Sequence, residues 1–371
     1  MIRTIIIDDE ELSIISLRKK LQRFPIIDVV KTYNSHKQLL SDLKHEKVDA
    51  IFLDIEMPGI SGMDLSEEIL NIQSSIQIVF VTAHSEYALQ AFEINSMDYL
   101  LKPVTSNRLA KTIDRLVKSL EGKKGCPSQE SHHIHLDIKC FNELQVFHQN
   151  KTVHFKTAKV KELFAFLLTH YNTYVNRDLI IEKLWPDQEY NKSKIYLHTC
   201  FSHLRKTLHE LGYPKCITFS NSSYILSLDH FYCDAIEFTR IVRDLKTLDP
   251  TNIETAEKAV QLYTGSFLAL NGFDWAYSYA QNYEGMLMDL LDKLTKYFQN
   301  LDNKKTLHYL QLQLKFNPYL EEIVKQIMLL SIKLGNRFEA ISVYRKYKSL
   351  LSEELGIEPN ASLTEVFHSI S

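Results

Sequence analysis

The sequence lacks long apolar runs, and its start lacks a basic stretch leading into an apolar core. A helix that crosses a bilayer needs about 20 consecutive apolar residues, and no stretch of the chain approaches that length. A secretory signal needs the basic and apolar regions that are missing here. We therefore expect a soluble protein that is not exported and resides in the cytoplasm.

Cysteine is scarce and is not arranged for a metal or for a set of disulfides. The chain has 5 cysteines, an odd number, and none of them forms a Cys-x-x-Cys pair. This pattern argues against both a disulfide framework and a zinc site, and it fits a reducing compartment. The cysteines are Cys126, Cys140, Cys200, Cys216 and Cys233.

The sequence also has no large excess of either charge: it contains 43 Lys and Arg and 46 Asp and Glu, which gives a net charge of −3. The balance nevertheless varies along the chain: residues 1–122 carry a net −4, residues 132–230 a net +3 and residues 231–371 a net −3. Only the middle segment suits a polyanion, and its excess is a weak signal by itself. The length of 371 residues predicts two to four domains.

The first third alternates short apolar runs with amphipathic stretches, which predicts a doubly wound α/β domain with five parallel strands over residues 1–121. A polar segment with two glycines and a proline follows, and we place a linker at residues 122–132. The predicted strands are Thr4–Ile7, Val29–Thr32, Ala50–Leu53, Ile78–Val81 and Asp98–Leu101.

Polar side chains follow four of these strands, at the edge where open α/β sheets bind ligands. Asp8 and Asp9 follow the first strand, Asp54 the third, Thr82 and Ala83 the fourth, and Lys102 the fifth. Converging carboxylates repel one another, so a hard cation such as Mg²⁺ is expected among them. Asp54 is placed to attack phosphorus as a carboxylate nucleophile, with Lys102 and the Thr82 hydroxyl as donors to the phosphoryl oxygens.

These motifs closely resemble the bacterial receiver domain over about residues 1–120. They include Asp8-Asp9-Glu10, Asp54-Ile-Glu-Met-Pro-Gly, Val-Thr82-Ala83 and Tyr99-Leu-Leu-Lys102-Pro103. The resemblance implies that a sensor histidine kinase phosphorylates Asp54. It also implies that Asp9, Asp54 and the main-chain carbonyl of Glu56 bind Mg²⁺, and that Asp8 acts through a water molecule. Thr82 and Tyr99 would form a switch pair.

Each of these residues alone has a plainer interpretation, as a helix cap, a strand residue or a surface charge. Their joint occurrence in the right order favours the phosphorylation site. Glu56 and His84 flank the pocket. They are predicted to set the lifetime of the acyl phosphate, with solvated rim residues as the alternative.

The middle segment, residues 133–230, predicts short strands, then helices over about 158–170, 176–184 and 192–211, and finally a hairpin. Leu197, Phe201, Leu204 and Leu208 recur at helical spacing in the third helix and predict its core face. The opposite face mixes cations with short hydrogen-bonding groups, which suits phosphate and base contacts in a major groove. This face holds Lys194, His198, Thr199, Ser202, His203, Arg205 and Lys206.

This arrangement resembles the winged-helix effectors of the OmpR/PhoB type and of the antibiotic-regulatory (SARP-type) activators. The resemblance implies binding to double-stranded DNA. The wing departs from the family pattern, because Phe219-Ser-Asn-Ser-Ser-Tyr224 carries no cation, which puts a minor-groove contact in doubt. The alternative is a basic helix face that is simply solvated.

Residues 231–371 are almost entirely helical in pattern, beginning at a capping-box motif of Asp234 and Glu237. Leu334-Gly-Asn-x-x-Glu-Ala340 has the spacing of a tetratricopeptide-like repeat. The segment from Leu350 to Pro359 resembles the bacterial transcriptional activation domain. We expect an all-α repeat domain that mediates dimerisation or binds RNA polymerase or another protein.

The sequence thus predicts a multidomain response regulator of a two-component system rather than an enzyme. Phosphorylation is expected to form a homodimer that binds DNA and regulates transcription. The alternative is a receiver-gated adaptor with weak or no DNA binding. A hydrolase is disfavoured, since Glu56 stands where phosphatases with an aspartate nucleophile place a second Asp.

Overall fold

The computed structural model describes residues 1–73, 75–83, 97–122 and 136–370. His84, residues 123–132 of the predicted linker and the first three residues of the predicted middle domain lie outside these ranges. The described residues divide into two compact units. One holds residues of the 1–122 and 148–231 ranges, and the other holds residues 136–147 and 232–370. No helix among the described residues is long and apolar enough to cross a membrane.

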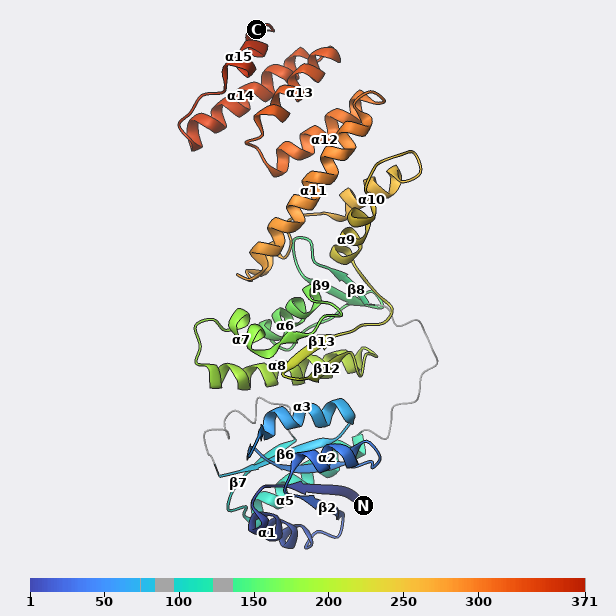
Figure 1. Ribbon diagram of the computed structural model, residues 1–371, viewed down its shortest axis with the longest axis vertical. Helices are drawn as coiled ribbons and strands as arrows, with labels where there is room; N and C mark the ends of the chain where they lie inside the picture. Colours follow the sequence, from blue (N-terminus) through green and yellow to red (C-terminus); the bar gives the residue numbers. More distant parts are fainter. Residues whose placement is uncertain (74, 84–96, 123–135, 371) are drawn as a thin grey trace. The chain divides into compact units, whose positions relative to one another are not determined.

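The N-terminal α/β domain contains the predicted five-stranded sheet, in the order β2-β1-β3-β6-β7, with every pair parallel (Figure 1). The strands are β1 (Ile2–Ile7), β2 (Ile27–Tyr33), β3 (Ala50–Asp54), β6 (Gln77–Thr82) and β7 (Asp98–Leu101). Each prediction was right to within two residues at either end. The fold class of this domain is therefore confirmed.

Helices cover both faces of the sheet because alternate side chains of each strand point to opposite faces. On β1, Ile5 and Ile7 belong to one buried cluster and Ile2 and Ile6 to the other. The helices are α1 (Glu11–Leu21), α2 (His36–Leu43), α3 (Gly62–Ile72) and α5 (Ser106–Gly122). A small hairpin that the sequence did not predict, β4 (Glu56–Met57) and β5 (Ile60–Ser61), precedes α3.

Residues 151–226 contain three helices and a hairpin, here called the three-helix segment. Thr157 and Asn176 cap the first two helices, each accepting a hydrogen bond from a backbone N–H of the first turn. Asn221 and Ser222 form the hairpin turn with φ values of 48° and 56°. The elements are β10 (Lys151–Thr152), α6 (Ala158–Thr169), β11 (Val175–Asn176), α7 (Arg177–Leu184), α8 (Tyr190–Glu210), β12 (Ile217–Ser220) and β13 (Ser223–Leu226).

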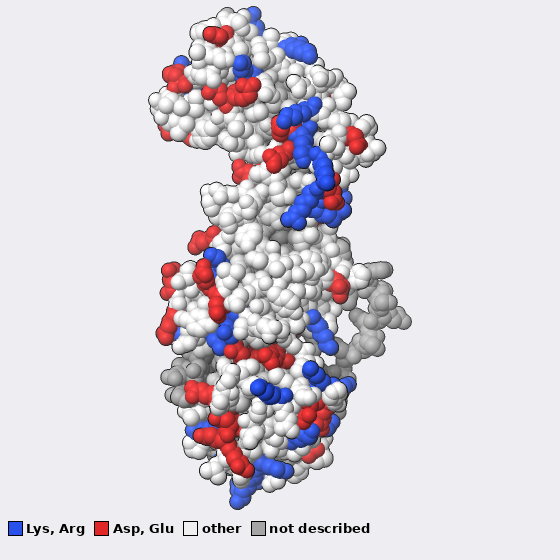
Figure 2. Space-filling model, in the orientation of Figure 1, with Lys and Arg blue, Asp and Glu red and all other residues white. Residues whose placement is uncertain are grey.

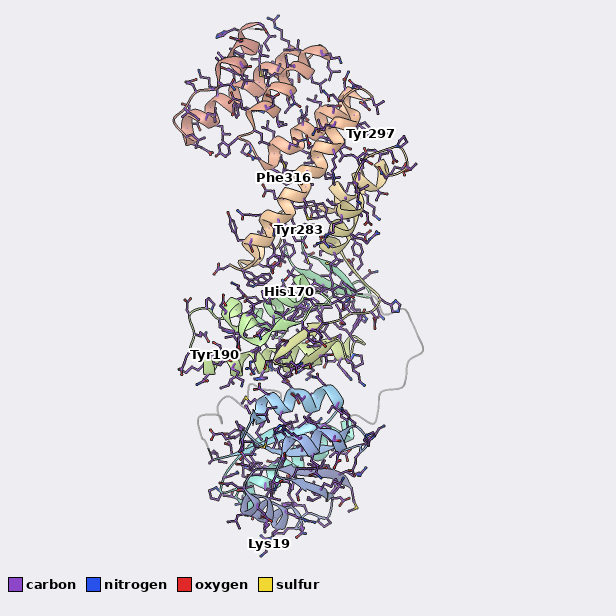
Figure 3. All side chains as sticks on the ribbon, viewed as in Figure 1. Lys19, His170, Tyr190, Tyr283, Tyr297 and Phe316 are labelled. Atoms are coloured by element: carbon purple, nitrogen blue, oxygen red, sulfur yellow. The ribbon has the colours of Figure 1, made fainter. Side chains whose placement is uncertain are left out.

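The second unit joins three strands to a helical array. Ala340, Tyr344 and Met328 are buried together in one apolar cluster, where the small side chain of Ala340 lets the helices pack closely. Gly335 precedes this helix and turns the chain with a φ of 77°. Figure 3 labels Tyr283, whose ring packs edge-on against Phe141. The elements are β8 (Leu136–Lys139), β9 (Gln145–His148), β14 (Phe231–Cys233), α9 (Asp234–Asp244), α10 (Ile253–Leu262), η2 (Ala269–Asn271), α11 (Ala276–Phe298), α12 (Asn303–Phe316), α13 (Glu321–Lys333), α14 (Arg337–Glu354) and α15 (Ala361–His368).

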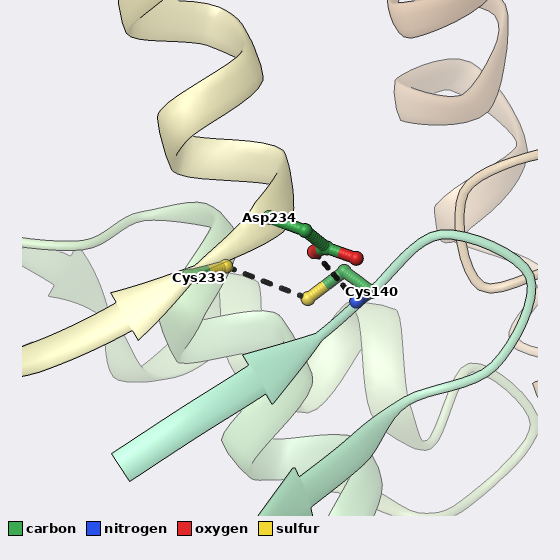
Figure 4. Close-up of side chains that lie close together, drawn as sticks. All are labelled: Cys140, Cys233 and Asp234. Atoms are coloured by element: carbon green, nitrogen blue, oxygen red, sulfur yellow. Dashed lines mark hydrogen bonds between the residues drawn. The ribbon is translucent and has the colours of Figure 1, made fainter. Parts of the chain in front are cut away.

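Helix α9 begins at Asp234, but this residue does not cap it as predicted. Its carboxylate instead accepts hydrogen bonds from the backbone N–H groups of Cys140, Phe141 and Ala235. Figure 4 shows the bond from Cys140. Cys140 and Cys233 lie beside it with their sulfur atoms 3.8 Å apart. The contact with Cys233, together with burial, raises the pKa of Cys140 well above its ordinary value, so the thiol stays protonated. This buried cluster ties β8 to the start of α9.

Candidate functional site

Three carboxylates meet at the carboxyl edge of the sheet because β1 and β3 are adjacent parallel strands. Asp8 and Asp54 are buried, whereas Asp9 is exposed. One oxygen from each lies within 4.8 Å of the others, close enough for a single cation to contact all three. The structure therefore brings together the side chains that the sequence predicted to meet.

Lys102 is the counter-charge of this pocket. Its Nζ donates hydrogen bonds to Asp8 Oδ2 at 2.8 Å and to Asp54 Oδ2 at 2.9 Å, and it lies 3.7 Å from Glu10. Burial lowers the pKa of Lys102, but the hydrogen bonds to both carboxylates outweigh burial and raise it. Burial raises the pKa of Asp54, and although Lys102 opposes this effect, the pKa remains above its ordinary value.

Gly62, at the start of α3, is a positioning residue to which the sequence analysis gave no role. Its backbone N–H donates to the carbonyl of Ile55 at 2.7 Å. A Cβ atom at this position would lie 2.0 Å from the backbone oxygen of Asp54, far inside contact distance. Only glycine lets α3 start this close to the backbone of Asp54.

The remaining pocket residues lie at the end of β6 and just after it, on β7 and at the start of β4. Thr82 is buried at the end of β6, and its carbonyl accepts a hydrogen bond from the Lys102 N–H at 2.8 Å. Tyr99 is buried in the cluster that lies toward α2 and α3. Ala83 and Glu56 are exposed at the rim.

The predicted DNA-contacting residues all lie on α8, but they differ in exposure. Lys206 is exposed, and Lys194, Thr199, Ser202 and Arg205 are half-buried. His198 and His203 are buried, with 2% and 9% of their surface exposed. Most of this face is therefore buried or half-buried in the structure.

His203 and Thr199 contact their own segment. His203 Nε2 lies 3.1 Å from the Nζ of Lys156, and burial together with the charges of Lys156 and Lys206 lowers the pKa of His203. The Thr199 hydroxyl donates to the carbonyl of Ile195 at 3.1 Å.

Lys194, His198 and Arg205 instead face carboxylates of α3. Lys194 donates to Asp64 at 2.8 Å, His198 lies 3.3 Å from Glu67, and Arg205 donates to Glu67. This contact between α3 and α8 lies within the first unit. The sequence analysis did not foresee it, because charge pairs between distant segments leave no local pattern.

Two families match the chain by their sequence models. The response regulator receiver domain matches residues 4–114, and the bacterial transcriptional activator domain matches residues 233–371. The chain therefore contains a receiver domain followed by a domain of the kind found in SARP-type activators.

Curated relatives match about a third of the chain. The chain is 42% identical over 120 residues to an uncharacterized response regulatory protein of Yersinia pestis, covering 32% of this chain and 50% of that protein. It is 30% identical over 139 residues to the transcriptional regulatory protein NatR of Bacillus subtilis, covering 36% and 60%. The chain thus spans about half the length of the curated relatives it matches.

Two solved structures extend the comparison. The response regulatory domain of mrkE from Klebsiella pneumoniae is 34% identical and has a TM-score of 0.31, covering 33% of this chain and 99% of that one. EmbR of Mycobacterium tuberculosis is 22% identical with a TM-score of 0.48, covering 63% and 64%.

Proposed function

We propose that this chain is a two-component response regulator in which phosphorylation of Asp54 by a sensor histidine kinase controls sequence-specific DNA binding and transcription. The observation that carries this proposal is the pocket itself. A buried carboxylate, Asp54, lies beside two further carboxylates and a lysine that bonds it directly. The matches to a receiver domain and to an activator domain support the same function.

In the proposed phosphotransfer, an oxygen of Asp54 attacks the phosphorus of a phosphohistidine on the kinase. The N–P bond breaks, the imidazole leaves and is protonated, and an acyl phosphate forms on Asp54. Lys102 would then exchange its bond to Asp54 for one to a phosphoryl oxygen. Because its pKa is raised, Lys102 is a cation throughout the physiological range.

The residues present fit a bound Mg²⁺, since the three carboxylate oxygens lie close together on one rim. Asp9, Asp54 and the main-chain carbonyl of Glu56 would hold the ion, with Asp8 acting through water. When bound, the ion supplies positive charge to the phosphoryl oxygens. Thr82, at the end of β6, would donate its hydroxyl to the phosphoryl group, with Ala83 beside it and Tyr99 as its aromatic partner in the switch.

We propose that the three-helix segment is a winged-helix DNA-binding domain and that α8 enters the major groove. Lys194, Arg205 and Lys206 would contact phosphates, and Thr199, Ser202, His198 and His203 would lie near base edges. The hairpin turn has no cation, and Tyr224 is fully buried, stacked on Phe201 at a centroid distance of 3.7 Å. Binding would therefore depend on α8 and on pairing of two chains rather than on the wing.

The helical C-terminal part would be a tetratricopeptide-like repeat domain that contacts RNA polymerase or another protein. We propose domain boundaries at residues 1–121, 133–230 and 231–371, with a linker at 122–132. No catalytic turnover of outside substrates is proposed. The chain would act in the cytoplasm, where its kinase presents the phosphohistidine.

A receiver-gated adaptor is the second candidate, and one observation favours it. Two of the three α8 cations that would meet DNA phosphates, Lys194 and Arg205, are paired with receiver carboxylates instead. If that pairing were permanent, the segment would be a scaffold rather than a DNA-binding surface. The two candidates differ in whether phosphorylation frees α8.

Selection from a random duplex library at near-physiological salt tests the proposal. It would be run with and without a small-molecule phosphodonor and Mg²⁺, using Asp54→Asn as control. Enrichment of a direct or inverted repeat that requires Asp54 supports the transcription factor. No enrichment in either state would favour the adaptor, as would a shallow dependence of affinity on salt.

A further inference from the structure

Helix α3 presents two carboxylates to the three-helix segment. Asp64 accepts hydrogen bonds from Arg177 Nη1 at 2.7 Å and from Lys194 Nζ at 2.8 Å, and it lies 3.5 Å from His198 Nε2. Burial raises the pKa of Asp64, but hydrogen bonds from His198 and Lys194 outweigh burial and hold this pKa well below its usual range. Asp64 is therefore charged whenever the contact is made.

Glu67, one turn further along α3, completes the contact. It is 3% exposed, and it pairs with Arg205 and with His198 Nδ1. Burial raises its pKa, but the charge of Arg205 and the hydrogen bond from His198 keep the pKa of Glu67 below its ordinary value. We call the six residues of this contact the α3 clasp: Asp64 and Glu67 on the receiver, and Arg177, Lys194, His198 and Arg205 on the three-helix segment.

Apolar and polar contacts extend the clasp. Ile195 of α8 is 5% exposed and belongs to the same buried cluster as Ile55 and Met63 of the receiver. The Asn71 side chain donates to the carbonyl of Phe219 at 2.6 Å. Figure 1 shows α3 running beside α8 and β12, and Figure 2 shows acidic side chains gathered at the level of α3.

We propose that the α3 clasp is an autoinhibitory contact, in which Asp64 and Glu67 occupy the cations of α8 and exclude DNA until the receiver is phosphorylated. This inference rests on the proposed function. A carboxylate and a DNA phosphate compete for the same N–H donors, so Lys194 and Arg205 can serve only one of them at a time. Ile195 is buried against the receiver, so the receiver covers this part of α8 and would block a duplex from approaching it.

A short connection joins the phosphorylation site to the clasp. Asp54 touches Gly62 through its backbone oxygen, and Asp64 lies two residues further on in the first turn of α3. A cavity of about 850 Å³ is lined by Asp9 and Glu56 of the pocket and by Lys194 of α8. Displacement of the segment after Asp54 would therefore shift the start of α3. Asp64, which pairs with Lys194 and Arg177, would shift with it.

Some buried polar atoms at the clasp are incompletely hydrogen-bonded, which limits how much the clasp stabilises the contact. Within the described residues, Arg205 Nη2 of the clasp and the buried Tyr224 hydroxyl, which is not part of it, have no hydrogen-bond partner, and His198 Nε2 approaches Asp64 only to 3.5 Å. Buried ion pairs gain little net free energy when their donors are incompletely satisfied. If the closed and open forms differ little in free energy, phosphorylation needs to supply only a small difference to shift the population from closed to open.

The test compares full-length Asp64→Asn/Glu67→Gln protein with wild type. A control, Asp114→Asn/Glu254→Gln, removes the same charge from α5 and α10, away from the clasp, and both of these side chains are exposed. Two readouts are needed. One is modification of His198 by diethyl pyrocarbonate, located by mass spectrometry. The other is affinity for the selected duplex with and without phosphodonor.

We expect His198 to be protected in wild type and in the control and reactive in the clasp variant. The unphosphorylated clasp variant should bind DNA at least about tenfold more tightly than wild type, because a closed protein binds in proportion to its open fraction. Phosphorylated wild type should approach the same affinity. Circular dichroism would show that both variants are folded.

Two results would overturn the inference. If His198 reacts in wild type as readily as in the variant, the clasp does not form in solution. A second result has two parts: His198 is exposed in the clasp variant, but the variant binds DNA no more tightly than unphosphorylated wild type. If phosphorylated wild type does bind DNA, the clasp is then not inhibitory, and the proposed function stands. If no form binds DNA, both the proposed function and the autoinhibition fail.

Discussion

At the scale of single residues, the pocket depends on one cation shared between two buried carboxylates. Lys102 bonds both Asp8 and Asp54, so it offsets a repulsion that burial would otherwise magnify. The same ammonium group is placed to bond a phosphoryl oxygen on Asp54. Its removal should therefore affect both the resting pocket and the phosphorylated one.

We predict that Lys102→Ala slows phosphorylation of Asp54 by a small-molecule phosphodonor by on the order of tenfold or more, since a donor to the developing charge is lost. Quantifying the phosphorylated fraction over time by intact-protein mass spectrometry measures this effect. Lys19→Ala is the control, because Lys19 is an exposed residue of α1, labelled in Figure 3. Equal rates for the two variants would remove Lys102 from the proposed mechanism.

Gly62 gives a second prediction at this scale. Gly62→Ala should destabilise the first unit by about 1–3 kcal/mol, because the new Cβ would overlap the backbone oxygen of Asp54. Urea unfolding measures the change. Gly285→Ala, in the middle of α11 with open space around the added methyl group, should instead stabilise the protein by about 0.5–1 kcal/mol. A neutral Gly62→Ala would show that the start of α3 can move away from Asp54.

At the scale of elements, the strands and their chemistry could be predicted from the sequence because both signals are local. Apolar runs followed by Asp54 or by Lys102 identified strand ends, and parallel pairing then brought those residues together. The role of Asp234 was mistaken, because the cap pattern does not show that its carboxylate accepts hydrogen bonds from Cys140 and Phe141, which follow β8 and lie far away in sequence. The contact of α3 with α8 was missed for the same reason.

The titration of His198 gives a prediction for the pair of helices α3 and α8. Burial lowers the pKa of His198, but the facing carboxylates of Asp64 and Glu67 raise it more, so its folded value lies above the ordinary 6.5. The charge on His198 therefore stabilises the contact fully below about pH 6.5, and this stabilisation is lost as pH rises through the folded pKa.

Urea unfolding of wild type and His198→Gln from about pH 5.5 to 8.5 checks this sign. The stability advantage of wild type over the variant should be largest at the acid end and shrink as pH rises. The carboxylates do not set this window, because their pKa values lie below their ordinary 3.8 and 4.5. An advantage that grows with pH would mean that His198 is neutral in the clasp.

At the scale of the whole molecule, the chain joins a receiver domain to an activator domain through a segment that neither family model covers. That segment includes the three-helix segment, which carries the proposed DNA contacts, and in the structure Lys194 and Arg205 of α8 are paired with receiver carboxylates. Regulation would then follow from competition. In the proposed sequence of events, phosphorylation of Asp54 would shift α3 and free α8, and paired chains would then bind neighbouring half-sites.

The most direct test of this account is the affinity of the full chain for its selected duplex across a salt series, with and without phosphodonor and Mg²⁺, in wild type and in Asp54→Asn. The account predicts that phosphodonor tightens binding by wild type alone and that affinity falls steeply with salt in the phosphorylated form. Equal tightening in Asp54→Asn, or a phosphorylated wild type whose binding barely depends on salt, would contradict it.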